Sequence, residues 1–136
     1  MVNYEKYDTA IQKLCDKLID AFGGTDTWNV VIHTDAPVRA TDSTLSDLTQ
    51  ITATGYTAGG SSIGFGSTRS AGIVTATASD VTWTAGGTWP AAQYVSLIDV
   101  TATNAVWCWW DYASTFTLAS GETFTVDFGA TLWTMS

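Results

Sequence analysis

Basic side chains are scarce in this sequence. Its 136 residues include five lysines and arginines against thirteen aspartates and glutamates, so the formal net charge is −8. Nucleic-acid binding needs clustered Lys and Arg that displace counterions from phosphates, and an anionic membrane surface makes the same demand. The sequence therefore predicts a chain that binds neither nucleic acid nor membranes.

Long apolar runs are also missing. No stretch of roughly 18 apolar residues occurs, so no transmembrane helix is predicted, and the first ten residues, MVNYEKYDTA, lack the apolar core of a secretion signal. Apolar residues nevertheless make up 46% of the chain, which is too many for a disordered protein. We therefore expect a single folded domain over residues 1–136.

Residues that carry catalysis or bind metals are few. His33 is the only histidine and falls in a predicted strand without a G-x-S-x-G motif, so no Ser-His-Asp triad is predicted. Cys15 and Cys108 form no C-x-x-C pair, which leaves two buried thiols or one helix-to-sheet disulfide. We expect no catalytic residue, cofactor or metal, because nothing selects a glycosidase pair from the late acids Asp99, Asp111, Glu122 and Asp127.

One amphipathic helix is predicted, over residues 3–22, and Gly23-Gly24 ends it. Its apolar positions recur at spacings of three and four residues: Tyr4, Tyr7, Ile11, Leu14, Leu18 and Phe22. A narrow stripe of this kind fits packing against the chain's own sheet, and it equally fits docking on a partner subunit.

After Gly24 the apolar period changes to two residues, which is typical of strands. Short strands are predicted over residues 28–33, 48–54, 73–78, 81–85, 94–100, 106–112, 124–128 and 131–134. Two loops are predicted, a polar one over 38–47 and a glycine-rich one over 55–72 that includes a short alternating segment at Ile63 and Phe65. This pattern predicts a mainly β fold, an antiparallel β-sandwich or small barrel over residues 27–134.

The strand predicted over residues 106–112 is unusual because large aromatic side chains occupy both of its faces. Strict alternation divides them into two sets: Trp107, Trp109 and Asp111, then Val106, Cys108, Trp110 and Tyr112. An exposed row of tryptophans would be a large apolar patch, which soluble monomers avoid. Three interpretations stay open: covering within the monomer, a subunit interface, or a platform on which sugar rings stack.

Four segments of the second half follow one another as strands and turns: residues 80–84 (DVTWT), 92–99 (AQYVSLID), 107–112 (WCWWDY) and 118–128 (LASGETFTVDF). Together with Gly55-Tyr56, this pattern resembles small tailed-bacteriophage virion proteins, which begin with a short helix and close with a meander of strands. The resemblance implies a capsid decoration (cement) protein or a tail- or fibre-associated protein. It implies a location in the virion after synthesis in the host cytoplasm, and no catalytic residues.

We therefore expect a non-enzymatic virion structural protein, a capsid decoration protein that stabilises the phage head. Its expected partners are the major capsid protein or other virion subunits and further copies of itself, with a trimer as the working assumption. The hypothesised interface consists of Tyr4, Tyr7, Ile11, Leu14, Leu18, Trp107, Trp109 and Trp110. The alternatives are a tail- or fibre-associated structural protein and a carbohydrate-binding receptor-recognition module.

Overall fold

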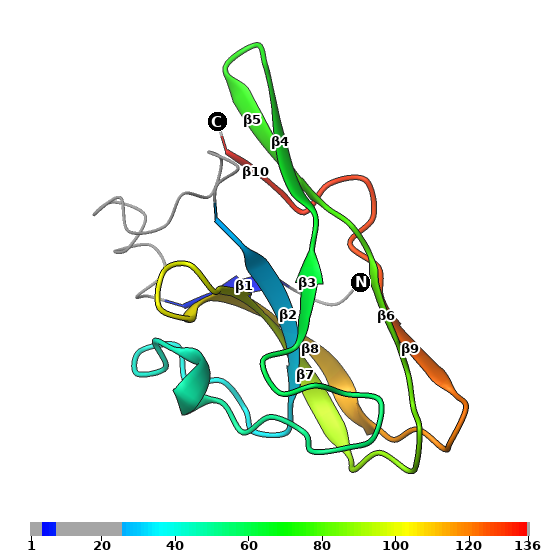
Figure 1. Ribbon diagram of the computed structural model, residues 1–136. Coiled ribbons are helices and arrows are strands. Elements are labelled where there is room, and N and C mark those ends of the chain that lie inside the picture. Colours follow the sequence, from blue (N-terminus) through cyan, green and yellow to red (C-terminus); the bar gives the residue numbers. More distant parts are fainter. Residues whose placement is uncertain (1–3, 8–25, 136) are drawn as a thin grey trace.

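The chain folds into antiparallel β-sheets, which confirms the mainly β class predicted from the sequence (Figure 1). The computed structural model describes residues 4–7 and 26–135. The elements of this part of the chain are, in order, β1 (Tyr4–Lys6), β2 (Trp28–His33), the short 3-10 helix η1 (Leu45–Asp47), β3 (Ser61–Ile63), β4 (Phe65–Ser70), β5 (Ile73–Ala78), β6 (Val81–Thr84), β7 (Ala92–Asp99), β8 (Ala105–Phe116), β9 (Thr123–Val126) and β10 (Trp133–Met135).

The largest sheet has five strands in the order β1-β8-β7-β2-β3. The hairpin β7–β8 forms its centre, and β2 pairs with β7 from Trp28 opposite Asp99 to His33 opposite Tyr94. Every residue of β2 except Asn29 is buried, so both faces of this strand are covered. That double covering explains why the sequence of residues 28–33 has apolar character on both faces rather than one.

The two smaller sheets join strands that are not neighbours in the chain. β6 pairs with β9, although the β7–β8 hairpin separates these two strands in the sequence. β5 lies between β4 and β10. Although only Ser79-Asp80 separates β5 from β6, these two strands belong to different sheets. The predicted simple meander is therefore wrong for residues 73–128, because these strands find their partners by long-range packing.

The predicted helix over residues 3–22 is wrong at its first turn. Tyr4–Lys6 form strand β1 along the outer edge of β8, with Tyr4 opposite Trp110 and Lys6 opposite Cys108. An unpaired strand edge offers backbone hydrogen bonds that a frayed helix start cannot match, which gives a physical reason for the change. The rest of the predicted helix, with Ile11, Leu14, Cys15 and Leu18, lies outside the described residues.

The glycine-rich segment 55–72 is the second correction, because half of its predicted loop is strand. Residues 61–63 form β3 and residues 65–70 form β4. Positive φ angles at Gly59, Gly60 and Gly72 place these glycines in turns, the first two before β3 and the third after β4. The strand predicted over residues 48–54 is also wrong, since this segment contacts β2 through one isolated bridge between His33 and Gln50.

Acidic side chains stabilise turns in this fold by accepting backbone N–H groups. Asp47 accepts from the amides of Ser43 and Thr44 at 2.9 Å each, and these bonds lower its pKa below the ordinary value. Five other acids accept a nearby amide in the same way, namely Asp42, Asp99, Asp111, Glu122 and Asp127. Asp35 and Asp80 instead accept from the distant amides of Thr49 and Phe128. The acidic composition is thus explained in part by local turn chemistry.

Candidate functional site

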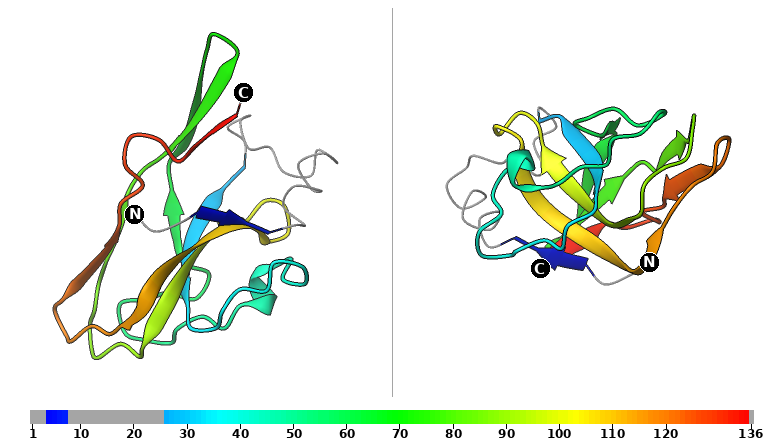
Figure 2. Two further views of the ribbon diagram at one scale, coloured as in Figure 1. Left: turned by 180° about the vertical axis from the view of Figure 1, so that it is seen from behind. Right: turned by 90° about the horizontal axis from the view of Figure 1, so that it is seen from below.

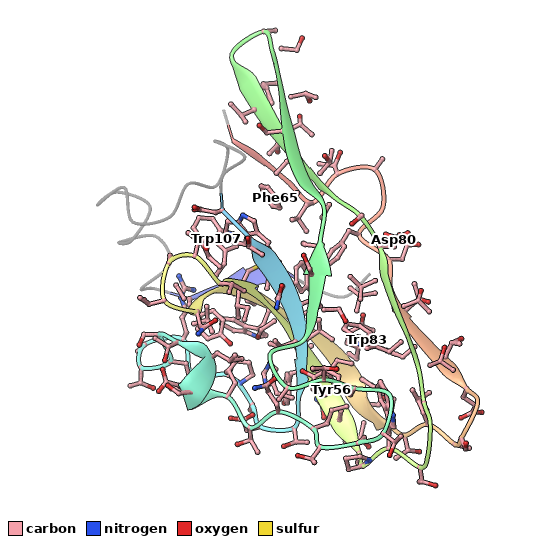
Figure 3. The ribbon with its side chains drawn as sticks, in the orientation of Figure 1. Tyr56, Phe65, Asp80, Trp83 and Trp107 are labelled. Atoms are coloured by element: carbon pink, nitrogen blue, oxygen red, sulfur yellow. The ribbon has the colours of Figure 1, made fainter. Side chains whose placement is uncertain are left out.

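The tryptophan-rich strand β8 lies mostly in the interior of the chain. Trp107 and Trp110 are 1% and 2% exposed. Trp107 meets Trp28 edge-on with ring centroids 6.2 Å apart, and Trp110 meets Phe128 at 5.3 Å. In the described structure these two rings are core side chains, and Figure 3 labels Trp107. Their hypothesised place in a subunit interface stays a prediction.

Strict alternation fails on β8 because the strand contains a β-bulge. Leu97 pairs with Cys108 whereas the next residue, Ile98, pairs with Val106, so Trp107 is the extra residue between them. A bulge re-aims the side chains around it. The predicted alternation therefore holds from Cys108 to Asp111, where the pairing with β7 is regular, and breaks at Trp107.

Trp109 is half-buried, and its neighbour is Tyr7, with ring centroids 4.6 Å apart. Tyr7 itself is fully buried, and its backbone N–H donates to the carbonyl oxygen of Trp107 at 3.2 Å. Of the hypothesised interface residues that the structure describes, Tyr7, Trp107, Trp109 and Trp110 thus contact their own chain, while Tyr4 lies on the edge strand β1.

The structure brings together a serine, a histidine and an aspartate that the sequence analysis did not connect. The Ser96 Oγ lies 2.9 Å from His33 Nε2, and His33 Nδ1 lies 3.2 Å from Asp35 Oδ1 and 3.0 Å from the Asp35 carbonyl oxygen. The pairing of β2 with β7 creates this cluster. Its one sequence signal is a polar residue, Ser96, inside an apolar strand, where burial demands a hydrogen-bonding partner.

This cluster has the residue types of a nucleophilic triad, but its serine and histidine are closed to solvent, while Asp35 is partly exposed. Ser96 and His33 are 0% exposed, and the Ser96 hydroxyl also shares a hydrogen bond of 3.1 Å with the Tyr7 hydroxyl. Because β7 lies between β2 and β8, its backbone amides are engaged in sheet hydrogen bonds rather than aimed at a reacting carbonyl. The arrangement is a buried polar network that ties β7, β2 and the Tyr7 segment together.

Burial lowers the pKa of His33 below its ordinary value of 6.5, and the nearby Asp35 only partly offsets that effect. The unfolded chain then binds this proton more readily than the folded chain does. The contribution of His33 to stability is therefore complete above about pH 6.5 and is lost as the pH falls below that value.

A second buried titratable group acts in the opposite direction. Asp99 ends β7 and is fully buried, and its Oδ1 accepts the Ala102 amide at 3.0 Å. Burial first, and then the neighbouring Asp26 carboxyl, raises the pKa of Asp99 to about 6. The folded chain thus binds this proton more readily than the unfolded chain does. Protonation of Asp99 therefore makes the fold more stable as the pH falls through about 6.

We expect two variants to separate these opposing contributions. Between about pH 7.5 and pH 5, His33→Gln should lose the decline in stability that His33 causes, whereas Asp99→Asn should lose the gain and decline more steeply than the wild type. At neutral pH the wild type buries a charged carboxylate at this position, whereas Asn is neutral and retains the acceptor for the Ala102 amide. Asp99→Asn should therefore also be more stable than the wild type at neutral pH. Urea unfolding across the pH range measures both effects, and parallel profiles for all three chains would contradict the assignment.

The largest partly exposed aromatic cluster among the described residues lies between β8 and β9. Phe116 and Phe124 stack with ring centroids 4.2 Å apart, and Tyr112 lies 5.8 Å from the first ring and 5.4 Å from the second. All three side chains are half-buried. Behind them the interior continues through Trp83, which stacks on Phe124 at 6.3 Å and lies 6.2 Å from Tyr56 (Figure 3).

A hollow of about 350 Å³ adjoins this cluster, and we call it the aromatic hollow. It is lined by Tyr112, Thr125, Asp127 and Gly129. Burial, and secondarily the negative charge of Asp127, raise the pKa of Tyr112 above its ordinary value. The hollow thus offers an aromatic ring, a hydroxyl and a carboxylate on one exposed face.

The described part of the chain offers no further reactive cluster. Residues 4–7 and 26–135 contain no group of three His, Cys, Asp or Glu side chains that could hold a metal ion. Cys108 is buried on β8, and the alternative of a disulfide with Cys15 involves a residue outside this part. Within the same ranges no helix is long and apolar enough to cross a membrane.

Comparisons with models of protein families, with curated proteins and with solved structures find no match for this chain. Its function is therefore argued from its own residues and their geometry.

Proposed function

We propose that this chain is a non-enzymatic structural protein of a bacteriophage virion and, within the virion, a capsid decoration protein that stabilises the head. The proposal starts from the resemblance of residues 80–128 to small virion proteins. It includes contacts with the major capsid protein or other virion subunits and with further copies of the chain. The sandwich or small-barrel arrangement predicted from the sequence stays part of this proposal.

The observation that carries the proposal is the hairpin of β4 and β5, residues 65–78, which we call the arm. It extends away from the other sheets in Figure 1 and in the left view of Figure 2. Among the arm residues whose burial the structure describes, Ala76 alone is buried, while Ile73 is 44% exposed. The strand β10 pairs with β5 only as far as Val74, and this three-stranded sheet has little core of its own, so contact with a neighbouring subunit would stabilise the arm.

The base of the arm is held firmly, which supports a role in presenting its tip. Phe65 stacks on Trp28 with centroids 5.0 Å apart and planes 20° apart. Gly64 and Ser79 exchange two hydrogen bonds of 2.8 Å across the base. The arm is thus anchored to the core at one end and exposed at the other.

The interior chemistry also supports a non-enzymatic role. The Ser96 and His33 side chains are buried, and the acids considered for a glycosidase pair each accept a backbone N–H of a nearby turn. Buried networks of this kind stabilise and specify a fold. The exposed surface, with few charged groups and many threonine and serine side chains, suits packing in an assembly.

The test is to locate the protein in purified particles of the phage whose genome encodes it. Mass spectrometry should find the chain in particles, and electron microscopy with a labelled chain should place it on the head. Absence from particles would remove the structural proposal. A label on the tail would replace decoration by the tail- or fibre-associated alternative.

A carbohydrate-binding receptor-recognition module is the second candidate, and the aromatic hollow favours it. An aromatic ring beside a carboxylate and a hydroxyl is the arrangement in which a sugar ring can stack and be hydrogen-bonded. A glycan array tests this candidate directly. Binding that is lost in Tyr112→Ala and retained in Trp109→Ala would support it at this hollow.

A further inference from the structure

The start of the chain contributes a short strand that is held along one edge. β1 lies at the outer edge of the five-stranded sheet, and among the strands of the described residues it pairs with β8 alone (Figure 2). Tyr7 continues this pairing, because its backbone N–H donates to the Trp107 carbonyl oxygen at 3.2 Å. We call residues 4–7 the N-terminal strand. Its backbone is attached to the rest of the described chain through the edge of β8.

Tyr7 is the side chain that anchors the N-terminal strand. It is fully buried, and its ring centroid lies 4.6 Å from that of Trp109. Its hydroxyl shares a hydrogen bond of 3.1 Å with Ser96 on β7, and Ser96 lies 2.9 Å from His33. Removal of Tyr7 would take a partner from this buried pair, and removal of the strand would bare an edge of the sheet. The outer edge of β8 and the position of Tyr7 thus form a binding surface for residues 4–7, which we call the acceptor edge.

Every copy of the chain carries both the N-terminal strand and the acceptor edge. The contacts of the strand join residues 4–7 to residues 96–110, far along the sequence. Residues 8–25 connect Tyr7 to Asp26, and a connection of that length spans at most roughly 60 Å. A folded chain of 136 residues has a radius of gyration of only about 14 Å. The strand of one copy is therefore able to reach the acceptor edge of a neighbouring copy.

We propose that residues 4–7 of one copy of this chain occupy the acceptor edge of a second copy, in place of that copy's own strand. The fit is the one seen within the chain, since exchange keeps every contact and changes only the molecule that supplies the strand. A tethered strand has an effective concentration on the order of millimolar, so exchange competes where copies are held at a similar local concentration. Neighbouring copies in the proposed virion would supply that condition, and for this proximity the inference rests on the proposed function.

The register of β1 on β8 allows a covalent test, because Lys6 lies opposite Cys108. Tyr7 and Trp107 are joined by a backbone hydrogen bond, so the preceding pair, Lys6 and Cys108, is a non-hydrogen-bonded pair with Cα atoms about 4.5 Å apart. A disulfide accepts that separation. Cys108 is buried, so a cysteine at position 6 reaches it only from a strand docked in this register.

The experiment mixes two full-length chains, both with Cys15→Ser, that cannot form this disulfide within themselves. The donor carries Lys6→Cys and Cys108→Ala, and the acceptor retains Cys108 and carries a mass tag. The two are refolded together and oxidised at about 1 mM and at about 10 μM protein, on either side of the condition for exchange. We expect a disulfide-linked donor–acceptor dimer, at least about tenfold more abundant at the higher concentration. Peptide mass spectrometry identifies the link between positions 6 and 108.

Two donor variants show whether the link reports a docked strand. Glu5→Cys in place of Lys6→Cys is the matched control, because Glu5 is exposed and lies opposite Trp109, one position out of register with Cys108. Its yield should be lower by about tenfold or more. Tyr7→Ala added to the Lys6→Cys donor should also lower the yield severalfold, because the docked strand loses its buried ring and the hydrogen bond to Ser96.

A single chain with Lys6→Cys, Cys15→Ser and native Cys108 completes the test. If this chain closes the disulfide within itself while the folded mixture gives no donor–acceptor dimer at either concentration, the strand stays on its own chain and the proposal is overturned. If this chain forms no such disulfide, the pairing of β1 with β8 is wrong and the proposal falls with it. Equal yields from the Glu5→Cys and Lys6→Cys donors would also overturn it. Particle localisation is a separate measurement, so failure of strand exchange and failure of the virion assignment are distinguishable.

Discussion

Trp110→Ala is expected to lower the free energy of unfolding by about 3–5 kcal/mol, the usual cost of truncating a buried aromatic side chain to alanine. Trp110 is 2% exposed and packs edge-on against Phe128 at 5.3 Å. A loss of this size is a large part of the stability of a domain, since the total is commonly about 5–15 kcal/mol. Urea unfolding followed by circular dichroism measures the change.

The matched control is Trp109→Ala, one residue earlier on the same strand. Trp109 is half-buried and its ring packs against Tyr7, so we expect a smaller loss, on the order of 1–2 kcal/mol. A larger loss of unfolding free energy in Trp110→Ala than in Trp109→Ala would support a core role for Trp110 over a role in a subunit interface. If Trp110→Ala left stability unchanged but abolished association, Trp110 would belong to an interface and its assignment to the core would be wrong.

Gly60→Ala should have the second large effect, about 3 kcal/mol or more in the free energy of unfolding. Gly60 has a φ of 76°, which side chains with a Cβ rarely adopt. A Cβ at this position would also collide with the carbonyl oxygen of Val30, on the buried strand β2, and would lie 2.7 Å from Val31 Cγ1. The backbone of a central strand cannot move aside cheaply, because it is packed on both faces.

Gly59→Ala is the control for that experiment. Gly59 has a similar φ of 93°, but a Cβ there would have no heavy atom within 4 Å. We therefore expect only the backbone cost of about 1–2 kcal/mol. Thermal and urea unfolding of the two variants should differ clearly. Equal losses would mean that φ alone decides the effect and that the close approach to Val30 is relieved by a small shift.

The strands that sequence reasoning predicted well are those with clear alternation or a strong apolar run. Residues 28–33, 73–78 and 81–85 match β2, β5 and β6 to within a residue, because a half-buried pleated surface requires that pattern locally. The segment 48–54 has a similar apolar content, yet it contributes Leu48 and Ile51 to the core without forming a strand. Apolar content alone does not distinguish these outcomes.

The candidate sites were much less predictable. The bulge at Trp107 depends on how β7 and β8 come into register, so strict alternation placed Val106 and Cys108 on one face although the bulge separates them. The meeting of Ser96 with His33 depends on which strand lies beside β7, and the two residues are far apart in the sequence. The aromatic hollow likewise combines the end of β8 with residues that follow β9.

The amino-acid sequence by itself determined the mainly β class, the place of most turns and the separation of an acid-free middle from an acidic second half. These properties follow from local backbone preferences and from composition, which need no knowledge of partners in space. Only the tertiary structure decided that the first half of strand β8 is interior, that a buried serine and histidine meet and reach an aspartate at the edge of the core, and that an arm projects from it. Those features arise from long-range strand pairing, whose register and order are selected by packing of the whole chain.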